Sequence, residues 1–283
     1  MKPSAISWTD HSGGNLNFVI GCSPVSPGCV NCYARAWADR YRQGEFWVES
    51  YPEKLDNLRR MQFPEFSPKR GAPHRPMAFV VDMGDLFHNE IPDDFIAQAF
   101  QVMAEREDVL WQVLTKRARR MRTLLSFWAS VSTYPAEGVP NVWLGVSAET
   151  QARADERIPL LLETPAAVRW VSVEPMLGPV DLDNYLRGWF TGVDTKVVGE
   201  DEYGSPILEP AQAQVQCPSL DWVVCGGESG PSRRPFVPAW AIDLYKQCRA
   251  AGVPYFYKQG SALQPGQDDE LPGIGKIKEW PDG

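Results

Sequence analysis

Short hydrophobic runs alternate with longer segments of helical periodicity over most of the chain. From about residue 77 onward, the hydrophobic runs lie at 77–82, 109–115, 142–147, 168–174, 221–226 and 254–258. The segments between them predict helices at 93–106, 116–129, 149–163 and 238–251. A further strand is expected at 17–21 and a helix at 32–42. This rhythm is typical of parallel βα units and indicates an α/β fold.

Four of the predicted strands share one pattern, in which a tryptophan stands four residues before a small or polar residue. The pairs are Trp111 and Thr115, Trp143 and Ser147, Trp170 and Glu174, and Trp222 and Gly226. Residues two apart share a strand face, so one face is expected to carry the tryptophans and become polar at the C-terminal end. The other face is aliphatic, with Gln112 as the exception.

A face that becomes polar at its C-terminal end predicts a partial or closed parallel (βα) barrel, with its chemistry at that end. An open doubly wound sheet is the alternative fold. Residues 183–219 interrupt the alternation with glycine, proline and acidic residues, and we interpret them as an insertion over the mouth or flank of the barrel. The whole chain, 1–283, is expected to be a single domain.

Composition and charge narrow the class of protein. The chain has 283 residues, of which 43% are hydrophobic, so it can bury a sizeable core. Lys and Arg total 28 against 36 Asp and Glu, and the net charge of −8 disfavours a general charge-based grip on nucleic acid. The five cations within 116–122 are expected to form a solvated helix face. The sequence shows neither a membrane-spanning run nor a secretory signal, so we expect a cytoplasmic protein with no membrane partner.

The cysteines are unevenly distributed, and three of the six lie within eleven residues. Cys22, Cys29 and Cys32 follow a predicted strand and precede a helix, so their loop can surround one soft metal centre. Zinc is one candidate, with His11 or Cys217 as the fourth ligand. Reduced cysteines without metal are another, and a [4Fe-4S] cluster with one open iron is the third. Cys225, on the aliphatic face, is interpreted as a small buried apolar residue.

A cluster bound by only three cysteines leaves one iron free to bind S-adenosyl-L-methionine. Three cysteines in the loop after the first strand of a partial βα barrel is the layout of the radical S-adenosylmethionine enzymes. In those enzymes an electron enters the bound sulfonium and a 5′-deoxyadenosyl radical results.

The chain also resembles a known group, the phage-associated three-Cys-motif proteins, from residue 7 to about residue 260. The motifs that carry this resemblance are Ser7-Trp8-Thr9-Asp10, Gly21-Cys22, residues 26–34, Met83-Gly84-Asp85-Leu86-Phe87-His88, residues 114–117, residues 143–147, residues 172–176 and Gly226-Gly227-Glu228-Ser229-Gly230. That family is widespread in phages and prophages, is largely uncharacterised and is similar in layout to radical S-adenosylmethionine enzymes. The resemblance therefore implies the cofactor and leaves the reaction open.

Several residues are expected around the cofactor. By position, Met83, Gly84 and Asp85 resemble the glycine-rich turn that meets the amino group of S-adenosylmethionine, although an ordinary βα turn fits equally. Ser147 and Glu149, at the exit of a strand, are candidates for the ribose or the methionine end of the cofactor; Glu149 alternatively belongs to a first helical turn.

Glu174 is the carboxylate most expected in the cavity, with Lys116 or Lys258 as its cationic partner. Residues 226–230 resemble a backbone nest for an anion or adenosine. Glu174, Glu228 and Lys258 are therefore the candidate catalytic residues.

The leading hypothesis is a radical S-adenosylmethionine enzyme that receives electrons from an external donor. The phage link of similar proteins favours a nucleobase or nucleotide as substrate, to be modified or repaired. One alternative is a non-enzymatic zinc- or cluster-stabilised phage protein that acts as a binding partner. Another is a barrel enzyme in which Glu174 and Glu228 act as general acid and base.

Overall fold

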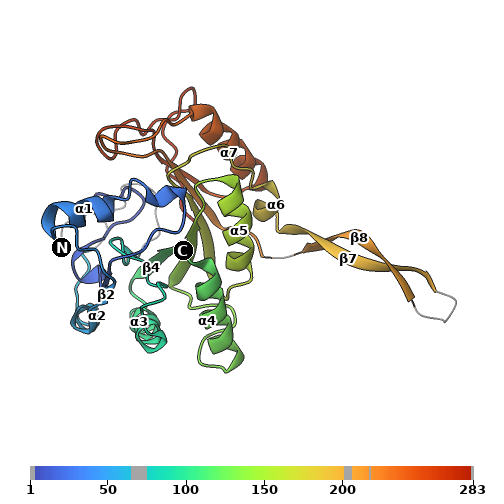
Figure 1. The fold of residues 1–283 in the computed structure, drawn as a ribbon, viewed down its shortest axis with the longest axis horizontal. Coiled ribbons are helices and arrows are strands. Elements are labelled where there is room, and N and C mark those ends of the chain that lie inside the picture. The colour runs from blue at the N-terminus through green and yellow to red at the C-terminus, as the bar shows by residue number, and fades with distance from the viewer. Residues whose placement is uncertain (1–3, 65–74, 201–205, 217, 282–283) are drawn as a thin grey trace.

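The computed structural model describes residues 4–64, 75–200, 206–216 and 218–281, with side chains outside 189–216. At its centre lies a six-stranded parallel sheet (Figure 1). Its strands are β3 (Met77–Phe79), β4 (Leu110–Thr115), β5 (Val142–Ser147), β6 (Val168–Val173), β9 (Trp222–Gly226) and β10 (Tyr255–Gln259). All six hydrophobic runs therefore form strands, as predicted.

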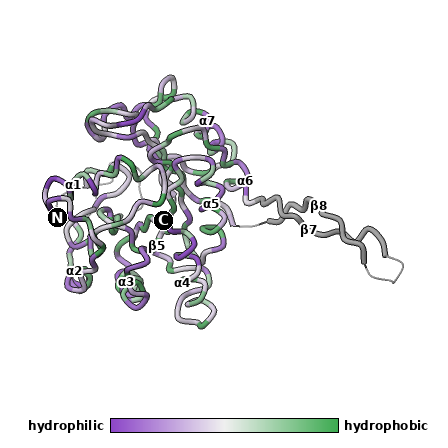
Figure 2. Tube along the Cα trace, viewed as in Figure 1, coloured by the Kyte–Doolittle hydropathy of each residue, from purple (hydrophilic) through white to green (hydrophobic). Residues whose placement is uncertain are grey.

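The predicted helices also form, within two residues of the expected bounds. They are α1 (Tyr33–Tyr41), α3 (Asp93–Glu105), α4 (Ala118–Ser130), α5 (Gln151–Leu162) and α7 (Pro238–Ala251). Three short helical elements (η1 Gly14–Leu16, η2 Pro27–Cys29, α6 Asp183–Leu186) and helix α2 (Pro52–Leu58) complete the set in the described residues. Hydrophobic and hydrophilic stretches alternate along α3, α4 and α5 (Figure 2), because one side of each helix packs on the sheet.

The strand order distinguishes between the two folds expected from the sequence. It runs β10-β9-β6-β5-β4-β3, so each strand lies beside its neighbour in the chain, apart from the inserted β7 and β8. In a doubly wound sheet the strand order reverses at a switch point, and the order seen here contains no such reversal. The sheet curls into a half-barrel with helices on its outer face (Figure 1).

The tryptophan pattern identified the faces correctly in three strands and wrongly in β4. Trp143, Trp170 and Trp222 lie together on the concave face. Trp111 instead packs in the cluster on the helix side. The register is the reason, because Trp111 pairs with Val142 and Gln112 pairs with Trp143. Gln112 therefore belongs to the concave face, where its amide donates to the Trp8 carbonyl at 3.5 Å.

The two ends of the described chain fill the concave face. Trp8 contacts the rings of Trp170 and Trp222, and the indole of Trp280 donates to the Trp8 carbonyl at 3.2 Å. The apolar cluster on this face contains strand residues and residues of the terminal segments, but no helix residue. Gly145 is required here, because a Cβ at that position would lie 2.4 Å from the Trp170 ring. The half-barrel is thus packed solid below its C-terminal edge.

The strand expected at 17–21 forms only in part and does not join the large sheet. β1 (Val19–Ile20) pairs antiparallel with β2 (Glu49–Ser50). The surrounding segment nevertheless runs beside the first strand region, through parallel bridges His11–Ala78 and Gly21–Gly84. The turn at η1 interrupts the segment, which prevents a continuous ladder. The cysteine loop follows directly after it.

The segment that interrupts the βα alternation contains a long hairpin. β7 (Trp189–Glu200) and β8 (Pro206–Gln216) pair antiparallel with each other and form a separate two-stranded sheet. The hairpin extends away from the half-barrel beside α6 (Figure 1). Among the described residues, no helix has the length and apolar character needed to cross a membrane.

Candidate active site

A cavity of about 250 Å³ lies at the C-terminal edge of the parallel sheet. All six strands or the turns that follow them contribute to its lining: Asp82, Thr115, Ser147, Ser172, Glu174, Glu228 and Lys258. The cysteine loop closes its other side, and Cys22, Cys29 and Cys32 all line the cavity. This edge is where parallel βα folds place their chemistry.

The three cysteine thiols are half-buried and form no disulfide bond with one another. Burial works to raise the pKa of Cys29, but hydrogen bonds from Val25 and Ser26 and the charge of Lys116 outweigh it, so the pKa lies below its ordinary value. Burial and the carboxylate of Asp85 raise the pKa of Cys22. Cys22 and Cys29 therefore sit in different electrostatic surroundings.

Arg117 joins the cysteine loop to the sheet. Its guanidinium donates to the Cys22 sulfur at 3.2 Å and to a carboxylate oxygen of Asp85 at 3.0 Å. It also donates to the carbonyl and the hydroxyl of Ser23, at 3.1 and 2.9 Å. The arginine is only 10% exposed, so these contacts lie largely out of water. The expected solvated cation face is thus wrong for Lys116 and Arg117, both of which line the cavity.

Asp85, predicted to contact the cofactor, is a buried acceptor of four hydrogen bonds. Besides Arg117, the backbone amides of Phe87 and Lys116 and the hydroxyl of Thr115 donate to it, at 3.0, 3.2 and 2.7 Å. Its carboxylate therefore links the turn after β3 to the C-terminal end of β4 and holds Arg117 in place.

Glu149 and Arg157 form a fully buried ion pair beneath the cysteine loop. A guanidinium nitrogen of Arg157 lies 3.1 Å from one Glu149 oxygen, and the amide of Gly28 donates to the other oxygen at 3.2 Å. Burial opposes ionisation of Glu149, but hydrogen bonds from Ser26 and the backbone, together with Arg157, hold its pKa below the ordinary value. A side chain at residue 28 would lie 3.0 Å from the Glu149 carboxyl carbon, so glycine permits this close approach.

Glu228 ties the other end of the cysteine loop to the strand β9 side of the cavity. It accepts hydrogen bonds from the Asn31 amide at 3.0 Å and from the backbone amide of Arg234 at 2.7 Å. The Arg234 guanidinium binds both Glu228 oxygens and also donates to the Pro27 carbonyl at 2.9 Å. We call Asn31, Glu228 and Arg234 the loop clamp. Residues 27–31 are thereby fixed to a segment about 200 positions away in the chain.

Glu174 and Lys258 form an ion pair inside the cavity. The Lys258 ammonium lies 2.5 Å from a Glu174 oxygen, and both side chains are 17% exposed. Lys258 is therefore the cationic partner that the sequence left open between two lysines. Lys116 instead donates to the hydroxyl of Ser147 at 3.4 Å. Within the described residues, Lys116 forms no ion pair with a carboxylate.

The turn after β3 carries a strained residue and an unpaired oxygen. Val81 has φ +59°, which a β-branched side chain seldom adopts. One carboxylate oxygen of Asp82 is buried without a hydrogen-bond partner in the described residues, and burial raises the pKa of this group. Gly84 lines the cavity, whereas Met83 packs beside Ala34 and Phe46.

Cys225, Cys248 and His11 do not line this cavity. Cys225 and Cys248 are buried, and burial raises the pKa of Cys225 to about 12, as an apolar interpretation of Cys225 predicts. His11 packs against the ring of Phe63, and Cys217 falls outside the described residues. In the part of the chain that the structure describes, no three His, Cys, Asp or Glu side chains are gathered as ligands of one metal ion.

The chain matches, over residues 3–271, a family model described as a protein of unknown function (DUF5131). The chain belongs to this family. The match agrees with the resemblance to an uncharacterised phage-type group and says nothing of cofactor or reaction. Neither the curated proteins nor the solved structures gave a match.

Sequence reasoning missed the residues of this DUF5131 protein that act through long-range contacts. Arg117, Arg157 and Arg234 each reach a carboxylate or backbone group of the site, and Asp82 offers its free oxygen there. Spacing gives no signal for the loop clamp, because its residues come from opposite ends of the chain. Asp82 had a signal, since it directly precedes the Met83-Gly84-Asp85 turn.

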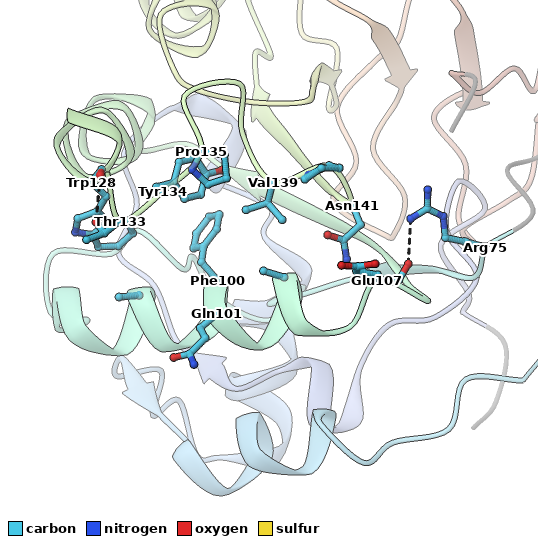
Figure 3. A pocket seen from close by; sticks show the side chains of 13 residues that line it. Arg75, Phe100, Gln101, Glu107, Trp128, Thr133, Tyr134, Pro135, Val139 and Asn141 are labelled. Carbon is cyan, nitrogen blue, oxygen red and sulfur yellow. Dashed lines mark hydrogen bonds between the residues drawn. The ribbon is translucent and has the colours of Figure 1, made fainter. Parts of the chain in front are cut away.

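The DUF5131 protein has a second cavity, of about 690 Å³, near the N-terminal ends of β4 and β5 (Figure 3). Phe100, Trp128 and Tyr134 supply its aromatic lining. The side chains of Arg75 and Asn141 donate to backbone carbonyls. The reactive side chains thus gather at the opposite edge of the sheet, in the smaller cavity.

Proposed function

We propose that this protein is a radical S-adenosylmethionine enzyme that carries one [4Fe-4S] cluster on Cys22, Cys29 and Cys32. One observation carries the proposal: the three thiols share a cavity with polar side chains from the C-terminal ends of all six parallel strands. A cluster held there faces the position at which a βα half-barrel binds its ligands.

The donor set fits such a cluster. Thiolates are the ligands that iron–sulfur clusters prefer, and each cysteine binds a different iron, so the thiols need not converge on one point. The loop is anchored on three sides, by Arg117, by Glu149 through Gly28, and by the loop clamp. These anchors orient the ligands in the way that contacts behind a metal site generally do.

The charges of the cavity fit the amino-acid end of S-adenosylmethionine. Three carboxylates already have cationic partners: Asp85 has Arg117, Glu174 has Lys258 and Glu228 has Arg234. Asp82 keeps a free oxygen and Lys116 lacks a carboxylate partner among the described residues. An ammonium group beside Asp82 and a carboxylate beside Lys116 would satisfy both.

This arrangement also divides the predicted residues by role. Gly84 and Ser147 stand where they can touch the cofactor, and Glu174 with Lys258 can hold or move a proton at the substrate. Asp85, Glu149 and Glu228 instead position the cysteine loop, because their oxygens are engaged by protein donors. Met83 supports the loop by packing.

Held by Cys22, Cys29 and Cys32, the cluster together with S-adenosylmethionine would supply hydrogen-abstraction chemistry: one electron from an external donor would convert the sulfonium into methionine and a 5′-deoxyadenosyl radical. We propose a nucleobase or nucleotide as the substrate class, on the phage link of similar proteins. The protein would act in the cytoplasm.

The test is anaerobic purification and reconstitution of the wild type and of C22A, C29A, C32A and the control C248A. We expect about four irons per chain in the wild type and in C248A, and loss of iron in the other three variants. Electron paramagnetic resonance of the reduced wild type should change on addition of S-adenosylmethionine, with release of 5′-deoxyadenosine.

Other outcomes would replace the proposal. One zinc per chain, with no response to S-adenosylmethionine, would identify a zinc-stabilised binding protein. Full iron loading in all three cysteine variants would show that the cluster is not held by these residues. An activity that survives loss of the cysteines would favour acid–base chemistry at Glu174 and Glu228.

A further inference from the structure

Among the described residues, Arg117 is the cation that donates a hydrogen bond to one of the three cysteine sulfurs. Arg117 directly precedes helix α4, whereas Cys22 lies in the loop after β1. The nitrogen that donates to the Cys22 sulfur also binds Asp85, while the other terminal nitrogen binds Ser23 twice. The guanidinium is therefore held in one orientation.

The position of Arg117 has an electrostatic consequence for any centre bound to Cys22. A donor aimed at a ligand sulfur withdraws electron density from it, and a positive charge nearby favours the state that carries one more electron. At 10% exposure, solvent screens the charge of Arg117 only weakly. Asp85 acts in the opposite sense, because its negative charge lies beside the same guanidinium.

We propose that the Arg117–Asp85 pair sets the reduction potential of the cluster through the Cys22 ligand, with Arg117 raising the potential and Asp85 lowering it. This inference rests on the proposed function. It goes further by assigning a tuning role to two residues that line the cavity beside the proposed cysteine ligands.

Ser23 and His88 complete the arrangement. The His88 ring accepts a hydrogen bond from the Glu90 amide at its Nδ1, so its Nε2 carries the proton and donates to the Ser23 hydroxyl at 2.8 Å. Burial and the charge of Arg117 lower the pKa of His88. Arg117 is therefore the positive charge among Arg117, Ser23 and His88. Besides its contacts with Cys22 and Asp85, it is held by Ser23, which His88 in turn positions.

The experiment compares midpoint potentials of the reconstituted full-length protein. Wild type, R117Q, R117K, D85N and R122Q are titrated under anaerobic conditions, with the reduced-cluster resonance as the signal. Arg122 is the matched control, because it lies on the same helix but pairs with Glu163 at the surface. Iron and sulfide content is measured for every sample, so that only loaded protein is compared.

We expect R117Q to shift the midpoint to more negative potential and D85N to shift it to more positive potential. R117K keeps the charge but loses the forked contacts, so its midpoint should fall between those of R117Q and the wild type. R122Q should match the wild type. Shifts of opposite sign would not follow from a general loosening of the loop.

Loaded R117Q and D85N with the wild-type midpoint would overturn the inference, and so would shifts of the same sign in both. Failure of both to take up iron, while R122Q loads normally, would show that the pair acts in assembly of the site and does not tune its potential. A wild type that binds no iron would overturn the proposed function itself.

Discussion

At the scale of single residues, the protein keeps its buried charges in pairs that hold the cysteine loop. The Arg157 and Glu149 side chains are 2% and 0% exposed, and they also bind the Ser147 carbonyl and the Gly28 amide. Removal of one partner from a buried pair leaves the other charge without compensation. Loss of one partner of this pair should therefore cost more stability than loss of one partner of an exposed pair on helix α5.

We expect R157Q to lower the free energy of unfolding by about 3 kcal/mol, because it leaves the Glu149 carboxylate buried and unpaired. The control R153Q, which breaks an exposed pair with Glu156 on the same helix, should change it by less than about 0.5 kcal/mol. Urea denaturation of the reduced apoprotein gives both values. The double variant E149Q/R157Q should lose less than R157Q alone; an equal or greater loss would contradict the uncompensated-charge argument.

The candidate site was predictable from sequence where its residues lie close together in the chain or stand at the end of a recognisable strand. Cys22, Cys29 and Cys32 stand within eleven residues, and Glu174 and Lys258 each stand at the end of a predicted strand. The partners of Asp85, Glu149 and Glu228 were not predictable, since hydrogen-bond geometry depends on contacts such as Asn31 to Glu228, 197 positions apart. A carboxylate at a strand end has the same sequence pattern whether it binds ligand or holds a loop.

At the scale of elements, periodicity predicted where strands and helices lie but did not fix every strand face. Strands buried on both faces are hydrophobic at consecutive positions, so the pattern in β4 does not show which of its side chains point to the concave face and which to the helices. Trp111 stands on the helix side because Phe63 packs edge-on against it and its indole donates to the Arg106 carbonyl. Phe63 and Arg106 lie outside the strand, so the spacing of the tryptophans could not predict these contacts.

The loop clamp should control the mobility of the cysteine loop. R234Q removes the bidentate contact to Glu228 and the hydrogen bond to the Pro27 carbonyl. Hydrogen bonds to charged groups contribute about 1.5–3 kcal/mol each, and partial exposure of Arg234 reduces this, so we expect amide exchange in residues 26–32 to accelerate about tenfold.

R233Q is the matched control for the clamp, because the Arg233 guanidinium donates to the nearby Gly230 carbonyl and, within the described residues, forms no ion pair with Glu228. Hydrogen exchange followed by mass spectrometry measures both variants at peptide resolution. Unchanged exchange in residues 26–32 of R234Q would mean that Arg117 and Glu149 hold the loop without the clamp.

At the scale of the whole molecule, the half-barrel is completed by segments that are not strands of its sheet. Trp8 and Trp280 fill the concave face, and the cysteine loop covers the C-terminal edge. The sequence indicated a partial or closed barrel without deciding between them. Closure depends on whether β3 and β10 meet, and the terminal segments that occupy the space between them have no strand periodicity that would predict their position.

The β7–β8 hairpin should be dispensable for the half-barrel. Its strands pair with each other and with no other strand in the described residues. The chain on either side of the hairpin is already joined by a hydrogen bond of 3.0 Å from the Leu220 amide to the Tyr185 carbonyl. A short Gly-Ser linker between Gly188 and Pro218 can therefore replace the hairpin at little cost in loop-closure entropy. We expect the free energy of unfolding to change by less than about 1 kcal/mol.

Urea denaturation and iron loading of the linker variant measure fold and site separately. Both should match the wild type if the hairpin serves only an external contact, because the cysteine cavity is built from the six central strands and the loop after β1. Cooperative unfolding with lost iron uptake would show that the hairpin takes part in the site. Loss of cooperative unfolding would show that it supports the sheet, and either result would contradict the independence inferred from its strand pairing.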